Sequence, residues 1–345
     1  MKSFLIKLLI FNALVFFLAI VLGEVKYSDE FIASKTKGTA YEKVGWNLDI
    51  INNYPERIKN STIFLGSSYV LNGVNDSVLS FNDKKVINMA VKHNGNDLGL
   101  YFLNRIKKLQ PKEVISLKHK FYTVGFHKLS PLLYRPSEYI ANGQTVNLYF
   151  VKYLFKRVKL TLEYLFYTPT KTVYKEEIKF FYGVRYAKNE LSKDYLKKSE
   201  NINKLNRIDE GFNLYQNGFN YISENLESLI IRKAKSLLRE IKFRFSNNSW
   251  LTNSSSQEAF VYKAKEISRL NKFKFSQLYI PVMSDLNINK KYKRSNFMPL
   301  ESDASNIYEI KDYSFLNSGV YWVDLHHLSK EGSILFTKAL AKKMK

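Results

Sequence analysis

A short apolar run that stops at a glycine and two serines occupies residues 62–68 and reads TIFLGSS. Two more apolar runs of similar length follow at 85–89 and 113–117, with a helical pattern at 97–109 between them. Short apolar strands that alternate with helical segments are typical of a parallel sheet covered by helices on both faces. The sequence therefore predicts an α/β fold in which TIFL is the first strand.

Similar elements return near the end of the chain. A Ser-Ser-Gln-Glu sequence at 255–258 fits a capping box and predicts a helix that runs to about Asn271. Strands are expected at 275–282 and 320–323, and a last helix at 330–344. The two blocks of α/β pattern therefore predict one domain made of two separated parts.

We divide the chain into an apolar N-terminal segment at 1–23, a first part of the α/β domain at 24–131, a largely helical insertion at 132–249 and a second part of the domain at 250–345. The insertion is basic and rich in aromatic residues. Residues 24–58 are expected to form a mixed, polar segment ahead of the first strand.

Two stretches of the insertion, 151–167 and 222–245, carry basic residues among apolar ones at helical spacing. A basic amphipathic helix can rest on an anionic membrane surface, or it can pack on the protein's own core and leave its charges in solvent. We expect core packing for both stretches.

The N-terminal segment reads MKSFLIKLLIFNALVFFLAIVLG and approaches the ~20 residues that span a bilayer. Lysines lie at its start, and acidic residues at 24, 29 and 30 follow it. The positive-inside rule then predicts a single-pass protein of the cell membrane, with its N-terminus in the cytoplasm and the domain outside. A cleaved signal peptide is the alternative, although an Ala-x-Ala pattern is missing before Glu24.

The composition limits the chemistry and the partners. The 345-residue chain has no cysteine, which excludes disulfides, zinc–thiolate sites and a cysteine nucleophile. Its net charge of +23 attracts polyanions, and an exported domain without a zinc-finger or RNA-binding signature argues against nucleic acid. We expect an anionic cell-envelope polymer or glycan as partner, the membrane through residues 1–23, and no cofactor, because no metal-ligand cluster or phosphate loop is visible.

The ends of the chain carry residues suited to acyl transfer. Ligands of open α/β sheets bind beyond the carboxyl ends of the strands, where Gly66 permits a sharp exit and the two serines follow. Far downstream, Asp324 and His327 stand three residues apart, so the carboxylate can hold the imidazole in the tautomer that accepts a serine proton. His326 is the neighbouring alternative, but the spacing favours His327.

These two segments resemble sequence blocks of the SGNH (GDSL-like) hydrolase superfamily. FLGSS at 64–68, followed by LNGVN at 71–75, is similar to the first block with Gly-Ser-Ser in place of Gly-Asp-Ser. DLHHLSKEG at 324–332 is similar to the Asp-x-x-His-Leu block and its trailing glycine. With the apolar N-terminus, the chain resembles the exported, membrane-anchored branch that includes the teichoic-acid D-alanyl-transfer protein and the alginate O-acetylation proteins.

The resemblance implies a flavodoxin-like three-layer parallel sheet and a catalytic triad. Ser68 would be the nucleophile, His327 the base and Asp324 its orienter, whereas Ser67 would hold the place of the family's aspartate. The expected activity is that of an extracytoplasmic esterase or acyl transferase acting on an envelope polysaccharide or teichoic-acid-like polymer. A membrane acyltransferase would supply the acyl donor.

The chain departs from the family at the oxyanion hole. Ala90 stands where the second block has glycine, and LKHK at 117–120 lacks the asparagine of the third block. The oxyanion candidates are therefore Ser68 through its backbone N–H, Gly95 and His119, with the flanking lysines of His119 as further donors. The rival functions are a catalytically degenerate scaffold of an envelope-polymer modification or export complex, and an anionic-lipid-binding surface protein.

Overall fold

The computed structural model describes most of the two α/β blocks and the N-terminal segment. The described residues are 2–37, 39, 41–80, 85–92, 96–118, 127–141, 148–169, 257–282, 307–318, 321–322 and 327–344.

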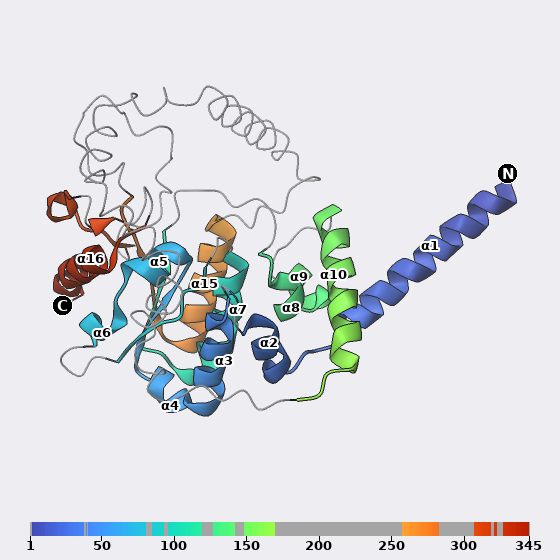
Figure 1. Ribbon diagram of the computed structural model, residues 1–345, viewed down its shortest axis with the longest axis horizontal. Coiled ribbons are helices and arrows are strands. Elements are labelled where there is room, and N and C mark those ends of the chain that lie inside the picture. The colour runs from blue at the N-terminus through green and yellow to red at the C-terminus, as the bar shows by residue number, and fades with distance from the viewer. Residues whose placement is uncertain are drawn as a thin grey trace, which may run out of the picture.

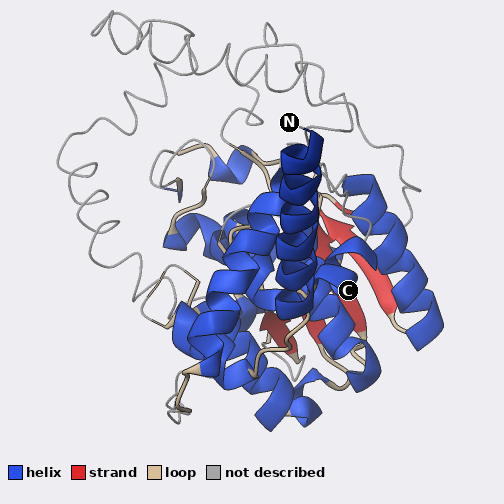
Figure 2. Ribbon diagram, turned by 90° about the vertical axis from the view of Figure 1, so that its right-hand side faces the viewer, coloured by secondary structure: helices blue, strands red, loops and turns tan. Residues whose placement is uncertain are grey.

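Within the described residues, the core is a five-stranded, wholly parallel sheet with the order β2-β1-β3-β4-β5. Figure 2 shows its strands in red among the helices. The predicted α/β architecture with a parallel sheet is confirmed. The strands are β1 (Thr62–Leu65), β2 (Val86–Asn88), β3 (Glu113–Leu117), β4 (Lys274–Leu278) and β5 (Ile307–Tyr308).

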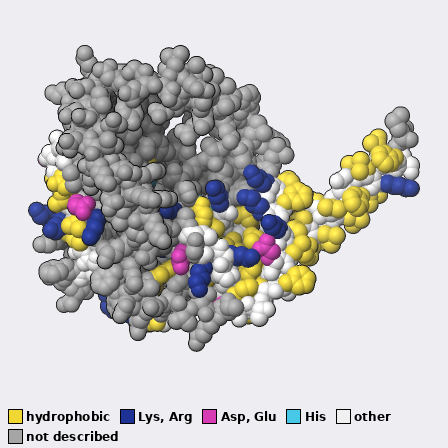
Figure 3. Space-filling model, in the orientation of Figure 1, with side chains coloured by type: hydrophobic (Ala, Val, Ile, Leu, Met, Phe, Trp, Pro, Cys, Tyr) yellow, Lys and Arg dark blue, Asp and Glu magenta, His cyan; other side chains and the backbone are white. Residues whose placement is uncertain are grey.

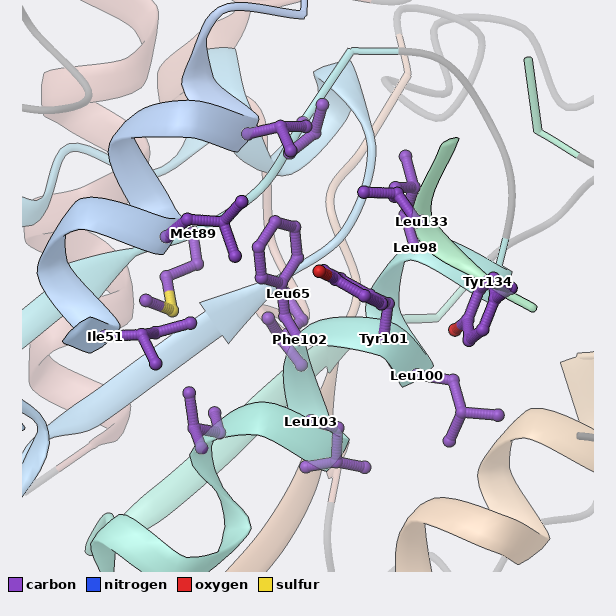
Figure 4. Packing of buried hydrophobic residues seen from close by; sticks show 14 of the residues in the cluster. Ile51, Leu65, Met89, Leu98, Leu100, Tyr101, Phe102, Leu103, Leu133 and Tyr134 are labelled. Carbon is purple, nitrogen blue, oxygen red and sulfur yellow. The ribbon is translucent and has the colours of Figure 1, made fainter. Parts of the chain in front are cut away.

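One face of the sheet is covered by helices from both parts of the chain. Ile63 and Leu65 of β1 join a buried apolar cluster with residues of the covering helices. Figure 4 shows Ile51, Met89 and Phe102 gathered beside Leu65. These helices are α2 (Asp29–Thr36), α3 (Lys43–Asn53), α7 (Asn96–Ile106) and α15 (Gln257–Asn271).

The expectation of a polar segment at 24–58 is wrong. This stretch contains α2, α3 and α4 (Pro55–Ile58), and it supplies a large share of the first cluster. Val44, Leu48 and Ile51 are buried and recur at the i, i+4, i+7 spacing of one helix face. Charged and amide residues between them hid this period in the sequence.

The opposite face carries a second buried cluster, centred on Phe64, Ile115, Leu278 and Phe336. Three helices contribute to it: α5 (Ser68–Gly73), α6 (Asp76–Leu79) and α16 (Lys330–Lys343). Figure 1 places these helices on one side of the sheet and α3, α7 and α15 on the other. The sheet is therefore a middle layer between two layers of helices.

Short helices α8 (Ser130–Leu133) and α9 (Pro136–Ala141) lead to α10 (Leu148–Leu165). Tyr153 and Leu154 of α10 are buried in the first cluster, in accord with the core packing expected for 151–167. The predicted helix at 222–245 and the capping-box serines at 255 and 256 lie outside the described residues. The division into domain parts stays a prediction.

The helix α1 (Lys2–Gly23) leaves the body of the molecule (Figure 1). Its apolar stretch Ser3–Gly23 is long and apolar enough to cross a membrane, and residues 3–18 of it are exposed, whereas Gly23 at its end is buried. This weakly supports the predicted membrane anchor through its length and composition, which a signal sequence near the N-terminus would share.

Two strand predictions near the C-terminus need correction. The strand expected at 275–282 ends at Leu278, although Ile280 and Val282 are still buried. At 320–323, Trp322 forms an isolated antiparallel bridge with Leu328 and is not part of the sheet. The sheet instead ends in β5, whose two residues are too few to show a strand pattern in the sequence.

Candidate active site

Ser68 follows β1, the strand at which the sheet's winding direction reverses. Between strand and helix, Gly66 packs so closely that a Cβ there would lie 2.5 Å from Cγ2 of Val70 and 3.1 Å from Cβ of Leu117. Ser67 then adopts an extended backbone as the N-cap of α5, and its carbonyl accepts hydrogen bonds from the Val70 and Leu71 amides, each at 3.0 Å. The chain therefore turns straight from β1 into α5, with Ser68 as the first helical residue.

The structure brings Ser68 to His327, 259 positions further along the chain. The distance from Ser68 Oγ to His327 Nε2 is 2.9 Å, which is within hydrogen-bonding range. Both residues are partly exposed, so the pair is accessible from outside. The Tyr69 ring lies 5.1 Å from the imidazole ring, centroid to centroid, with 32° between the planes.

The two neighbouring serines differ in accessibility. Ser67 is 2% exposed, and its hydroxyl has no hydrogen-bond partner among the described residues. Ser68 is partly exposed and faces an imidazole nitrogen. Of the two serines, Ser68 is therefore the one whose hydroxyl is both accessible and next to a possible base.

The residues that follow His327 pair with the described residues 321 and 322. Trp322 and Leu328, both buried, form an isolated antiparallel bridge, and the Ser329 amide donates to the Tyr321 carbonyl at 2.9 Å. Ser329 then caps α16, since its hydroxyl accepts from the Gly332 amide at 3.1 Å. A Cβ at Gly332 would lie only 2.1 Å from the Tyr321 carbonyl oxygen, so this close approach requires glycine.

The helix after His327 is tied directly to the helices after Ser68. Thr337 of α16 is fully buried, and its hydroxyl accepts a hydrogen bond from the Asn75 amide at 3.0 Å. The same hydroxyl donates to the Gly73 carbonyl at 3.4 Å. The two segments that carry the Ser–His pair are thus fixed to each other through α5, α6 and α16.

Asn88, at the end of β2, holds α5 in place through side-chain hydrogen bonds. Its buried side-chain Nδ2 donates to the carbonyls of Val70 at 3.0 Å and Val74 at 2.8 Å. Its Oδ1 accepts from the Ala90 amide at 3.1 Å. Its own backbone amide donates to Asp76 at 3.2 Å. Sequence reasoning missed this role, because a single polar residue within the apolar run at 85–89 does not indicate its partners.

The hydrogen bonds of Asn88 also affect the Ala90 amide, which is at a predicted oxyanion-hole position. Ala90 is fully buried, and its N–H is already used by Asn88. At the position where the resemblance predicts an oxyanion donor, the backbone amide is therefore already paired within the protein. The Ser68 N–H, by contrast, has no acceptor among the described residues.

Several predicted site residues fall in undescribed segments. Asp324, His326, Gly95 and His119 all lie outside the described residues. The predicted roles of these four residues stay predictions, as does the full triad. Among the residues that the structure describes, no group of three or more His, Asp or Glu side chains could hold a metal ion.

The Ser–His geometry permits base-assisted attack. If Nε2 accepts the Ser68 proton, the other ring nitrogen, Nδ1, must carry the hydrogen in the neutral imidazole. An imidazolium at this position would lie beside the Tyr69 ring, whose π-system attracts positive charge.

Comparison of the chain with family models, with curated proteins and with solved structures found no match.

Proposed function

We propose that this chain is a membrane-anchored, serine-dependent acyl-transfer enzyme, an esterase or O-acyltransferase, that acts on a cell-envelope polymer outside the cytoplasm. The 2.9 Å contact between Ser68 Oγ and His327 Nε2 carries the proposal. Two residues so far apart in sequence meet with the spacing that nucleophile and general base require.

In the proposed reaction, Ser68 Oγ attacks an ester or thioester carbonyl while His327 takes the hydroxyl proton. Collapse of the tetrahedral intermediate breaks the bond to the leaving group, which receives that proton from His327 and departs. Water or a polymer hydroxyl then gives its proton to His327 and attacks the acyl-serine. Ser68 is released when it recovers the proton, and the acyl group ends on water or on the polymer.

Supporting residues complete this proposal. Asp324 would orient His327 and stabilise the imidazolium. The Ser68 N–H is a candidate donor to the oxyanion, with Gly95 and His119 as the other candidates.

The strand order supports an SGNH-type, flavodoxin-like assignment. In doubly wound sheets with the order 2-1-3-4-5, the ligand site lies at the carboxyl ends of the strands where the winding reverses. Ser68 occupies that place beyond β1. The apolar α1 supports membrane attachment, and the charge of +23 supports an anionic polymer as substrate.

One observation favours a second candidate, a catalytically degenerate scaffold on the same fold. The Ala90 amide at the family's oxyanion position is occupied by Asn88. Loss of one oxyanion donor typically slows turnover by about 10²–10³-fold. A scaffold would need the fold and the membrane helix, but no reactive serine.

Envelope-polymer acylation in cells separates the two candidates. Cells whose own copy is replaced by wild type, Ser68→Ala or Ser67→Ala are compared at equal amounts of the protein in the membrane. The enzyme proposal predicts loss of polymer acylation with Ser68→Ala and retention with Ser67→Ala. Full acylation with Ser68→Ala would overturn the enzyme proposal and favour the scaffold.

A further inference from the structure

The helix α10 has a buried face and an unusual exposed face. Its exposed face combines large apolar side chains with lysines and lies where α1 leaves the body (Figure 3). Phe155 is 65% exposed, Leu162 is 49% exposed, and Phe166, just after the helix, is 87% exposed. The lysines of this face are Lys152, Lys156 and Lys159.

The buried face of α10 is hydrogen-bonded to the C-terminal end of α1. Arg157 is 1% exposed, and its guanidinium donates to the carbonyls of Gly23 at 2.8 Å, Pro131 at 2.8 Å and Val25. The Thr161 hydroxyl donates to the Leu22 carbonyl at 2.9 Å. The bond to Gly23 satisfies a carbonyl that the end of α1 leaves without an intrahelical partner, and the guanidinium places a positive charge at the negative end of the α1 dipole.

The length of α1 determines where its contact with α10 lies relative to the surface of a bilayer. Its apolar stretch Ser3–Gly23 has 21 residues. A membrane-spanning helix needs about 20 residues to cross a hydrocarbon core of ~30 Å. There is no spare length, so an embedded α1 puts Gly23 at the membrane surface. Because α10 binds Leu22 and Gly23 directly, it lies at the same level.

The charges on this face are suited to an anionic surface. The acidic residue in the sequence of α10 is Glu163. Its carboxylate forms an ion pair with Lys35 at 2.6 Å and a longer one with Lys159 at 4.0 Å. Burial, followed by repulsion from Lys152 and Lys128, lowers the pKa of Lys156. A phosphate group beside these ammonium groups would relieve that repulsion.

We propose that α10 lies on the bilayer that α1 crosses, with Phe155, Leu162 and Phe166 in the headgroup region and its three lysines on anionic phospholipid headgroups. Apolar side chains inserted at this depth and lysines at the surface are the two features by which interfacial helices bind. The inference depends on α1 being embedded, and it is independent of the chemistry of Ser68.

The absence of cysteine in the chain allows a direct depth measurement. Phe155→Cys and Phe166→Cys, each in the full chain, are labelled with an environment-sensitive fluorophore and placed in bilayer nanodiscs of phosphatidylcholine mixed with phosphatidylglycerol. Tyr262→Cys on α15 is the matched control, because Tyr262 is 74% exposed on a different helix.

The proposal predicts that the labels at 155 and 166 are quenched by spin-labelled lipid and protected from aqueous iodide, while the label at 262 shows the reverse. Iodide quenching at 155 and 166 equal to that at 262 would overturn the docking of α10.

A charge variant tests the lipid class. Replacing Lys152, Lys156 and Lys159 by glutamine should weaken docking on the anionic discs by roughly fivefold per lysine. Discs of phosphatidylcholine alone should weaken the docking of the unmodified chain in the same direction. Equal protection in both lipids and in the triple variant would overturn the assignment of anionic headgroups. An unchanged helix content by circular dichroism and an unchanged urea midpoint show that the triple variant is folded, whatever the result at the membrane.

Discussion

Replacing Asn88 by alanine should destabilise the protein and displace the helix that carries Ser68. The Asn88 side chain is fully buried and holds α5 through the carbonyls of Val70 and Val74. It also accepts the hydrogen bond from the Ala90 amide. Asn88→Ala removes all three bonds together.

The size of the effect follows from the groups left without a partner. The Val70 carbonyl keeps the hydrogen bond from the Val74 amide at 3.0 Å, so it stays paired. The Val74 carbonyl and the Ala90 amide are both buried and lose the bonds that Asn88 made. Each unsatisfied buried group costs about 1–3 kcal/mol, so the free energy of unfolding should fall by roughly 2–6 kcal/mol. This is a large part of the ~5–15 kcal/mol of a typical domain.

Urea unfolding of the detergent-solubilised chain, followed by tryptophan fluorescence, measures this loss. The matched control is Asn53→Ala, since Asn53 is exposed and donates only to Asp49 at 2.6 Å. The control should change the unfolding free energy by less than about 0.5 kcal/mol. At urea concentrations too low to unfold the protein, Asn88→Ala should also slow phosphonate labelling of Ser68 by tenfold or more. A nucleophile misplaced by 1 Å can lower the reaction rate by up to ~10²-fold. Equal stabilities of Asn88→Ala and Asn53→Ala would refute the reasoning.

Three further predictions concern the base and the buried charge. Gly332→Ala should destabilise the protein by about 1–3 kcal/mol or more, because the new Cβ would lie 2.1 Å from the Tyr321 carbonyl oxygen. The substitution should also slow phosphonate labelling of Ser68 by displacing His327. An unchanged urea midpoint and labelling rate would contradict this prediction. Tyr69→Leu should slow labelling about two- to fivefold, because it removes the ring beside His327, and Tyr69→Phe should retain the rate; equal rates for the two variants would exclude a role of the ring. Burial lowers the pKa of Lys43 from 10.5 to about 7 despite a neighbouring carboxylate. Between these two values the unfolded chain binds the proton and the folded chain does not, so stability should rise with pH by up to about 1.4 kcal/mol per pH unit. Lys43→Met should remove this rise, as urea midpoints at about pH 7 and pH 9.5 will show.

The sequence predicted the strands near the candidate site well. TIFL, the run predicted at 85–89 and the strand at 113–117 all contribute strands to the observed sheet, the second of them over Val86–Asn88, because each is a short apolar run. The last helix also begins at Lys330 as expected, and the structure shows that Ser329 caps it. Local patterns of this kind survive folding because neighbouring residues determine them.

The parts that could not be predicted depend on long-range contacts. Trp322 forms a bridge with Leu328, and its indole N–H donates to the Leu316 carbonyl, so its partners lie outside the predicted strand. Arg157 reads as one more surface charge of a basic helix, yet it is buried against the carbonyls at the end of α1. Asn88 likewise has no local pattern that reveals its three partners. In each case the deciding partner lies at a position that sequence spacing does not indicate.

The candidate site was predictable in part. Ser68 and His327 were paired by residue type and motif resemblance, and the structure places them 2.9 Å apart. The preference for Ser68 over Ser67 agrees with the burial of Ser67. The use of the Ala90 amide by Asn88 could not be foreseen, because it depends on a side-chain conformation at the end of β2.

Covalent labelling by a serine-directed phosphonate, with the modified peptide located by mass spectrometry, tests the central claim most directly. The account predicts a single adduct on Ser68 in the wild-type chain, none in Ser68→Ala, and labelling at least ~10³-fold slower in His327→Gln. Ser67→Ala should be labelled at close to the wild-type rate. Labelling of Ser68→Ala at the wild-type rate, or a wild-type adduct at another serine, would contradict the account.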